Sequence, residues 1–142
     1  FKQKTAYEIY QCDWSSDVCS SDLPEGLEEL LVSLREQFPR QALMVTENGA
    51  AFDDVVAADG SVPDPERLDY LRRHFTAAHR AMARGVDLRG YFVWSLLDNF
   101  EWGYGYAKRF GIVRVDLDTL ERTVKDSGRW YQQLVATHEL PA

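Results

Sequence analysis

The sequence is poor in cysteine, in positive charge and in long apolar runs, and each shortage excludes a class of protein. Its two cysteines, Cys12 and Cys19, fit no metal-ligand spacing. The 16 Lys and Arg residues are outnumbered by 23 Asp and Glu, and the net charge of −7 argues against a nucleic-acid partner, whose phosphates it would repel. No run approaches about 18 apolar residues, so we expect no membrane span. The sequence shows no basic start followed by an apolar stretch, the pattern that would indicate secretion. The composition therefore predicts a soluble, cytoplasmic protein.

The first 23 residues differ from the rest of the chain. They read FKQKTAYEIYQCDWSSDVCSSDL, a polar stretch with neither helical nor strand periodicity. Residues 13–23 read as the translation of a common sequencing-adapter DNA, and residues 1–9 resemble the matching primer. We therefore treat residues 1–23 as a non-native segment that we expect to be disordered, and we leave it out of the fold prediction. Residues 24–142 are taken as the C-terminal segment of a natural domain, and we expect the natural coding sequence to continue upstream.

Regular patterning begins at Pro24. A first helix ends at Pro39, and its apolar side consists of Leu27, Leu30, Leu31, Leu34 and Phe38. Residues 42–46 form a short apolar run typical of a strand buried on both faces, and Asn48-Gly49 signals a turn. Asp64 is a good N-cap for a second helix, which ends near Gly85, and its apolar stripe consists of Leu68, Leu71, Phe75, Ala78 and Met82.

The remaining residues predict a second buried strand, a hairpin and a last helix. Residues 90–97 are the strand candidate. Residues 112–115 and 122–124 pair across a turn at Asp118-Thr119, and Ser127 caps the final helix. Strands that alternate with helices indicate βαβ units and a parallel sheet, hence an α/β fold. A complete (β/α)8 barrel needs about 250 residues, so this chain could form only part of one.

Glu47 is the first candidate catalytic residue. It directly follows the predicted strand at residues 42–46, and barrel enzymes place their catalytic groups at the carboxyl ends of strands. Glycoside hydrolysis uses two carboxyl groups, one of which is the nucleophile in retaining enzymes. The spacing alone leaves open that Glu47 is a surface residue before an ordinary turn.

Several motifs at characteristic separations place Glu47 in context. The runs LMVTENGAAFDD and GYFVWSLLDNFEWGYGYAKRFGIVRVD contain T-E-N-G, D-N-F-E-W and R-F-G-I. Between them stands R-x-x-Y-L-x-x-H at Arg67 to His74, and K-x-S-x-x-W-Y follows from Lys125. This combination resembles family 1 glycoside hydrolases from about Pro24 to the end. The resemblance implies the C-terminal part of a (β/α)8 barrel: the last helix of unit 6, then βα units 7 and 8.

The resemblance also implies roles for individual residues. Glu47 matches the nucleophile of a retaining β-glucosidase. Glu101 matches the glutamate that binds the 4- and 6-hydroxyls of the sugar, and Trp102 matches the tryptophan that binds a neighbouring hydroxyl. Trp94 matches the platform under the sugar, and Phe110 matches an aromatic wall. The expected partner is a small β-glucoside or short oligosaccharide, with no metal and no organic cofactor.

Other polar residues receive structural interpretations. We expect His74 and His79 to be packing or surface residues. Asp98 and Asn99 are predicted to hold their loop through side-chain-to-backbone hydrogen bonds. Asp53 and Asp54 are predicted to be solvated loop charges.

One part of the expected machinery is missing from the sequence. The family's N-E-P motif, whose glutamate is the general acid/base, does not occur in it. We therefore expect this chain alone to be inactive, since a retaining enzyme needs both carboxyl groups about 5–5.5 Å apart.

Three alternatives stay open. The first is a 6-phospho-β-glycosidase, a kind of relative in which serine replaces the residue at the Glu101 position. Lys108 is compatible with phosphate binding, but Glu101 and Phe110 are not compatible with this alternative. A family member could instead act on galactosides or fucosides. A non-catalytic sugar-binding module would have to fold on its own, which bare strand edges oppose.

Overall fold

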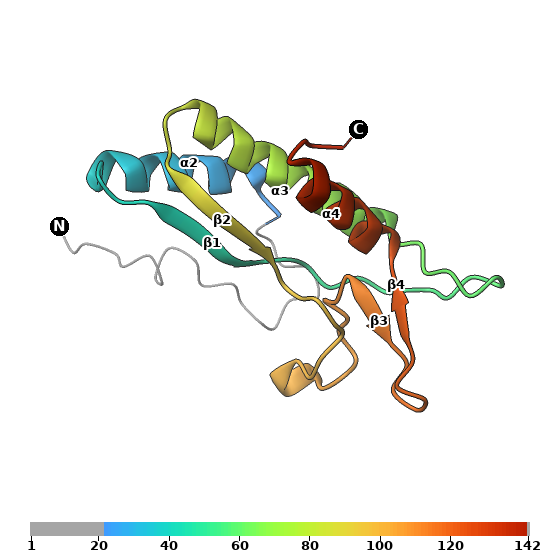
Figure 1. The fold of residues 1–142 in the computed structure, drawn as a ribbon. Helices are drawn as coiled ribbons and strands as arrows, with labels where there is room; N and C mark the ends of the chain where they lie inside the picture. The colour runs from blue at the N-terminus through green and yellow to red at the C-terminus, as the bar shows by residue number, and fades with distance from the viewer. Residues whose placement is uncertain (1–21, 142) are drawn as a thin grey trace.

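The structure is a computed structural model that describes residues 22–141. The strands β1 (Leu43–Asn48) and β2 (Leu88–Val93) form a two-stranded parallel sheet, and α3 (Pro65–Ala83) connects them. The helices α2 (Pro24–Gln37) and α4 (Asp126–Thr137) lie on the same side of this sheet as α3 (Figure 1). A short 3-10 helix, η1 (Trp102–Tyr104), lies in the loop after β2. The predicted α/β class is confirmed. The proposed boundary at residue 23 falls at the edge of the described residues, and residues 1–21 lie outside them.

Two hydrophobic clusters join the helices to the sheet. The first packs α2 and α3 against β1 and β2, and its buried members are Leu27, Leu31, Val32, Ala78, Ala81 and Val86. The second joins α3 to α4, and its buried members are Tyr70, Leu71, Ile112 and Trp130. Met82 and Phe38, which were predicted on the apolar helix sides, are instead 47% and 53% exposed. Each is the last residue of its predicted stripe.

The helices cover only one face of the sheet. Leu43 and Val45 of β1 pack toward the helices, whereas Met44 is 55% exposed. Phe92 of β2 is also 51% exposed. The prediction that the first strand is buried on both faces and that the second strand is buried is therefore wrong for the described residues. The alternation of side chains along a strand sends every second residue to the uncovered face.

Both predicted strands are shifted relative to the observed ones. β1 runs through Asn48, so Glu47 lies inside the strand and not after it. β2 ends at Val93 and does not continue to residue 97. The backbone just after β2 pairs with a later segment of the chain instead of with β1. The Ser95 amide donates to the Phe110 carbonyl, and the Ile112 amide donates to the Ser95 carbonyl.

Of the two predicted helix caps, the position of Asp64 is confirmed and that of Ser127 is wrong. Asp64 precedes α3 and Pro65 is its first residue, but the Asp64 side chain makes no capping hydrogen bond. Its carboxylate instead accepts hydrogen bonds from Arg67 at 2.5 Å and from the Ser127 hydroxyl at 2.5 Å. Lys125, and not Ser127, occupies the N-cap position of α4. The Asp64 and Ser127 side chains thus bind each other in a tertiary contact that the local sequence does not reveal.

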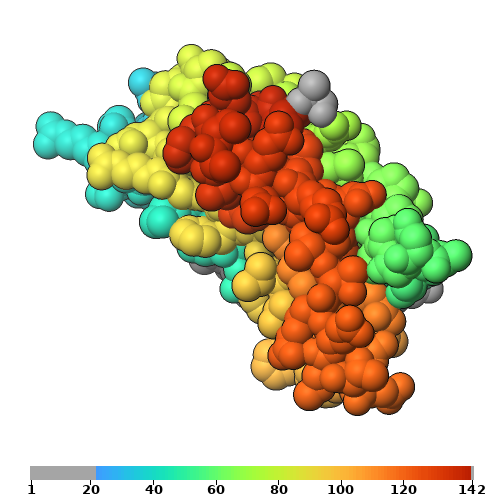
Figure 2. All heavy atoms as spheres, turned by 45° about the vertical axis from the view of Figure 1, so that its right-hand side comes forward, coloured from blue at the N-terminus to red at the C-terminus, as the bar shows by residue number. Residues whose placement is uncertain are grey.

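The predicted hairpin is confirmed as β3 (Val113–Val115) paired with antiparallel β4 (Arg122–Val124). The Asp116 carboxylate closes its turn by accepting from the Asp118 and Thr119 amides. Figure 2 shows the hairpin, in orange, extending away from α4, with the loop between β1 and α3, in green, beside it. None of the helices within residues 22–141 is long and apolar enough to cross a membrane. The cytoplasmic location stays a prediction.

Candidate active site

Glu47 lies near the carboxyl end of β1, at the edge where β2 also ends. Asn48 is paired with Val93, and the amide of Trp94 donates to the Asn48 carbonyl at 2.9 Å. The side chain of Glu47 is exposed. Parallel strands end at a common edge, and so Glu47 and the segment after β2 are brought to one side of the sheet.

Trp94 links this edge to Glu101. Its indole Nε1 donates to the Glu101 carboxylate at 3.3 Å. Glu101 is only 6% exposed, and burial raises the pKa of its carboxyl group, while the hydrogen bond from Trp94 lowers it. The Glu101 amide donates to the Gly105 carbonyl at 2.7 Å, which fixes the tight loop around η1. The structure thus brings together Trp94 and Glu101, two of the predicted site residues.

The aromatic side chains around Glu101 are more open than we expected. Trp102 is 82% exposed and has a positive φ of 44°, while Phe100 and Tyr106 are 60% and 52% exposed. Glu101 itself is buried, so the side chains on either side of it in the sequence differ from it in exposure. Phe110 is half-buried, and its carbonyl accepts from the Ser95 amide.

Asn48 is held by two tyrosines. Its Nδ2 donates to the Tyr70 hydroxyl at 3.1 Å, and its Oδ1 accepts from the Tyr91 hydroxyl at 2.6 Å. Asn48 was interpreted only as a turn residue. The contacts fix the residue next to Glu47 against α3 and β2, so they orient the strand end. The R-x-x-Y pattern contained Tyr70, but nothing in the local sequence connected it to Asn48.

A buried ion network lies behind the two loops that leave the sheet edge. Asp54 pairs with Arg67 at 2.8 Å and with Lys125, and the side chains of all three are no more than 1% exposed. The prediction that Asp54 is a solvated loop charge is thus wrong, whereas Asp53 is exposed as predicted. An unpaired buried carboxylate would be costly, and Asp54 avoids this cost through partners distant in sequence.

Asp98 occupies the other end of this network. It accepts from the Gly111 and Val115 amides, as predicted for a loop-holding residue, and it pairs with Arg109 at 2.7 Å and Lys125 at 3.0 Å. Burial by itself would raise the pKa of Asp98, but the hydrogen bond from Arg109 and the charge of Lys125 hold that pKa below its usual value. Asn99, the second predicted loop-holding residue, donates to the Ser95 hydroxyl, and within residues 22–141 its side chain makes no hydrogen bond to a backbone group.

The two histidines of α3 have the structural roles that we predicted. His74 is 1% exposed and stacks on Tyr70 with ring centroids 3.9 Å apart. Its Nδ1 lies 2.9 Å from the Tyr70 carbonyl, which assigns the proton of the neutral ring to Nδ1. Burial lowers the pKa of His74. His79 is exposed.

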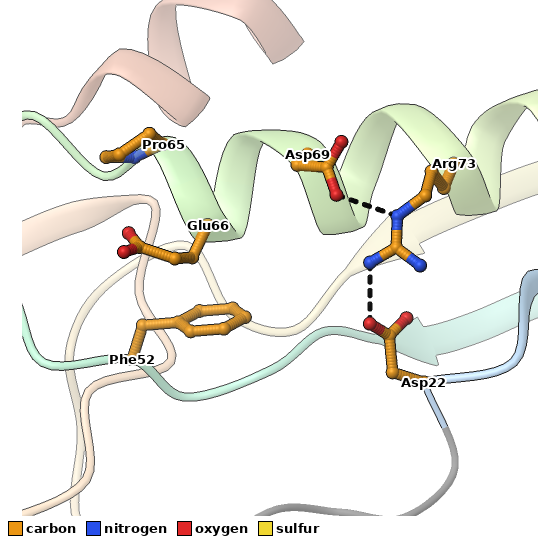
Figure 3. A pocket seen from close by; sticks show the side chains of 6 residues that line it. All are labelled: Asp22, Phe52, Pro65, Glu66, Asp69 and Arg73. Atoms are coloured by element: carbon orange, nitrogen blue, oxygen red, sulfur yellow. Dashed lines mark hydrogen bonds and ion pairs between the residues drawn. The ribbon is translucent and has the colours of Figure 1, made fainter.

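A separate surface depression lies at the start of α3 (Figure 3). It is lined by Asp22, Phe52, Pro65, Glu66, Asp69 and Arg73. Arg73 bridges Asp22 at 2.5 Å and Asp69 at 2.8 Å, and these side chains are 39–64% exposed. None of the predicted site residues lines this depression, and its ion pairs are exposed, so it does not coincide with the candidate site. Within residues 22–141, no group of three or more His, Cys, Asp or Glu side chains is arranged to hold a metal ion.

The βαβ unit and the carboxylate at its strand edge define the class of the protein. Parallel strands with site residues at their carboxyl ends are the repeating design of (β/α)8 enzymes. A sequence model described as "Glycosyl hydrolase family 1" matches residues 2–140, and the chain belongs to this family.

Individual relatives agree with this assignment. β-Glucosidase A from Thermotoga maritima is 54% identical over 118 residues, which are 83% of this chain and 26% of the relative. A solved family 1 β-glucosidase from Thermotoga maritima matches with a TM-score of 0.81 and 54% identity, over 84% of this chain and 27% of that one. A 6-phospho-β-galactosidase from Lacticaseibacillus rhamnosus is 36% identical over 145 residues, covering 99% of this chain and 29% of the relative. The chain thus spans about a quarter of the length of these proteins.

Proposed function

We propose that this chain supplies the nucleophile and part of the sugar-binding site of a retaining β-glucosidase, which releases terminal β-D-glucose. Glu47 attacks the anomeric carbon and forms a covalent glycosyl-enzyme, which water then hydrolyses. The general acid/base comes from a part of the enzyme that this chain does not match. The chain corresponds to the last helix of barrel unit 6 and to βα units 7 and 8.

The position of Glu47 carries this proposal. The residue lies near the carboxyl end of β1, and the Trp94 amide ties that end to the segment after β2. A nucleophile must be held in a fixed geometry relative to the sugar. The contacts of Asn48 with Tyr70 and Tyr91 supply that rigidity next to Glu47.

The sugar itself is bound by residues of the loop after β2. Glu101 accepts hydrogen bonds from the 4- and 6-hydroxyls, and Trp102 donates its indole N–H to a neighbouring hydroxyl. Trp94 supplies the platform and Phe110 an aromatic wall. The contact between Trp94 and Glu101 supports this assignment, because it places the platform and the hydroxyl-binding carboxylate side by side.

A hybrid enzyme tests the proposal. Residues 24–142 replace the matching segment of the Thermotoga maritima β-glucosidase A, and we expect this hybrid to hydrolyse an aryl β-glucoside. Glu47→Ala should lower its kcat by at least about 1000-fold, since the covalent route is lost. Added azide should restore turnover and give the α-glucosyl azide, because the small anion fits the space that the carboxylate leaves.

Asp53→Ala is the matched control, since Asp53 is an exposed carboxylate in the loop that follows β1. We expect it to leave kcat unchanged. A folded hybrid without activity would contradict the proposal. So would a Glu47→Ala variant that retains more than about a tenth of the parent rate, because loss of a nucleophile should cost several kcal/mol of transition-state stabilisation.

The alternatives concern the sugar and not the family. The Lacticaseibacillus rhamnosus relative is named a 6-phospho-β-galactosidase. A 6-phosphorylated substrate is disfavoured here, because the buried carboxylate of Glu101 would repel a phosphate dianion in a poorly hydrated site. Galactosides and fucosides differ from glucosides in hydroxyl positions. Comparing kcat/KM of the hybrid on these aryl glycosides ranks them directly.

A further inference from the structure

Six charged side chains form one buried, balanced network behind the sheet edge. It consists of Asp54, Asp64, Asp98, Arg67, Arg109 and Lys125. Apart from Arg109, whose side chain is 21% exposed, these side chains are no more than 3% exposed. The three carboxylates and the three cations compensate one another, which is the condition under which buried charges are tolerated.

Lys125 is the member that joins the two loops of the candidate site. Its ammonium contacts Asp54, in the loop after β1, and lies 3.0 Å from Asp98, in the loop after β2. Glu47 lies at the end of the strand that leads into the first loop, and Glu101 follows Asp98 closely in the second. The side chain of Lys125 is 0% exposed, so no water competes for these contacts.

Other contacts anchor both loops to one segment. The Arg109 carbonyl accepts from the Phe52 amide at 3.4 Å and from the Arg67 guanidinium at 2.7 Å. Asp98 in turn accepts from the Gly111 amide at 3.0 Å. Residues 109–111 are the last part of the second loop, so the contact of Phe52 with Arg109 joins the two loops through the backbone. Among the residues that the structure describes, Lys125 is the side chain that pairs with a carboxylate of each loop.

We propose that Lys125 is a positioning residue that sets the location of Glu101 relative to Glu47. The inference rests on the proposed function, in which Glu101 binds hydroxyls of the sugar that Glu47 attacks. Lys125 touches neither the sugar nor the reacting atoms. Its removal leaves Asp54 paired with Arg67 and Asp98 paired with Arg109, but it takes away the charge that holds the two carboxylates near each other. Two like charges separate once the cation between them is gone.

The test uses two substrates that differ only at the hydroxymethyl group, whose 6-hydroxyl is one of the two hydroxyls that Glu101 is proposed to bind. The hybrid enzyme is assayed on an aryl β-glucoside and on the β-xyloside with the same leaving group, which lacks the hydroxymethyl carbon. The ratio of the two kcat/KM values does not depend on the fraction of folded enzyme, so a loss of stability alone does not change it. Lys125→Met should lower the ratio by about tenfold, since a displacement on the order of 1 Å costs up to about 100-fold in rate.

Two further variants separate the possible causes. Glu101→Gln should also lower the ratio, and the Lys125→Met/Glu101→Gln double variant should match Glu101→Gln, because Lys125 acts through Glu101. Arg89→Met removes a cation from an exposed pair with Asp87, and it should leave the ratio as in the parent hybrid.

Each outcome has a definite meaning. A ratio that Lys125→Met leaves within about twofold of the parent overturns the positioning role, even when Glu101→Gln lowers it as expected. A ratio that Glu101→Gln does not change overturns the proposed sugar contact instead. Asp54→Asn, which keeps the size of the side chain, is the second variant and should act in the same direction as Lys125→Met. If neither Lys125→Met nor Asp54→Asn yields folded enzyme, the network is required for folding and the positioning role is wrong.

Discussion

Gly49 lies directly after β1, where the backbone of Trp94 approaches it so closely that no side chain fits between them. A Cβ atom at position 49 would lie 1.8 Å from the Trp94 carbonyl oxygen and 2.8 Å from its carbonyl carbon. Replacing Gly49 with alanine therefore requires the two backbones to separate by more than about 1 Å, since close-packed interiors leave no slack. The same backbones are joined by the hydrogen bond from the Trp94 amide to the Asn48 carbonyl.

The expected cost of Gly49→Ala follows from this geometry. Overpacking of this kind destabilises proteins by about 1–3 kcal/mol. The separation also moves Trp94 away from the strand end that carries Glu47, and a shift on the order of 1 Å can lower activity about 100-fold. We therefore expect the Gly49→Ala hybrid to have a lower Tm and about 100-fold lower kcat/KM on an aryl β-glucoside.

Gly26→Ala is the matched control. A Cβ atom there would lie 3.6 Å from the Leu23 side chain, an ordinary contact, and the position is helical. Alanine in a helix is more favourable than glycine by about 0.5–1 kcal/mol, so this variant should have an unchanged or raised Tm and unchanged kcat/KM. Full activity and stability of Gly49→Ala would show that the close approach to Trp94 does not organise the site.

Three further predictions concern activity, specificity and pH. The chain assayed by itself should show no β-glucosidase activity above background, and turnover of about 1–10³ per second would contradict this. Glu101→Ser in the hybrid should reduce transition-state stabilisation on the plain glucoside, measured from kcat/KM, by about 1–3 kcal/mol for each hydrogen bond lost. It should also narrow the difference in kcat/KM between the plain glucoside and the 6-phosphate, and an unchanged ratio of the two values would exclude Glu101 from the sugar site. Because burial holds the pKa of His74 below its unfolded value, its contribution to stability should be complete above about pH 6.5 and be lost as the pH falls. The Tm of the hybrid should therefore fall more on acidification than the Tm of His74→Phe. The Tm of His79→Gln should depend on pH in the same way as that of the parent hybrid.

The charges around His74 decide the size of that last effect. Asp22 and Glu25 raise the pKa of His74, whereas Arg73 lowers it, and burial outweighs them all. The Asp22 carboxylate lies 4.0 Å from Nδ1. If the hybrid and His74→Phe lose stability in parallel below about pH 6.5, protonation of His74 is not coupled to unfolding.

The difference in burial between Asp53 and Asp54 could not be predicted from the sequence. The two neighbours are the same residue type in the same polar loop, and both were predicted to be solvated, yet only Asp53 is exposed. The partners of Asp54 are 13 and 71 positions away in the sequence. No local pattern records a contact of that kind, because it depends on how the loop folds back on α3 and α4.

The elements themselves were easier to predict than their ends. Helical periodicity and proline signals located the helices, since local backbone preferences largely determine these features. The end of β2 depends instead on pairing with residues 110–112, which are distant in sequence. The resemblance to family 1 glycoside hydrolases singled out Glu47, Glu101 and Trp94 as candidate site residues, but it gave no indication of the hydrogen bond between Trp94 and Glu101.

The most direct test of the account is to trap the covalent intermediate. The hybrid enzyme is incubated with a 2-deoxy-2-fluoro-β-glucoside that has a dinitrophenyl leaving group. The fluorine slows both steps, while the leaving group favours the first, so the glycosyl-enzyme accumulates. Peptide mass spectrometry then locates the sugar. We predict that the fluoroglucosyl group is attached to Glu47. Attachment to Glu101 or to any other carboxylate would contradict the assignment of Glu47 as the nucleophile.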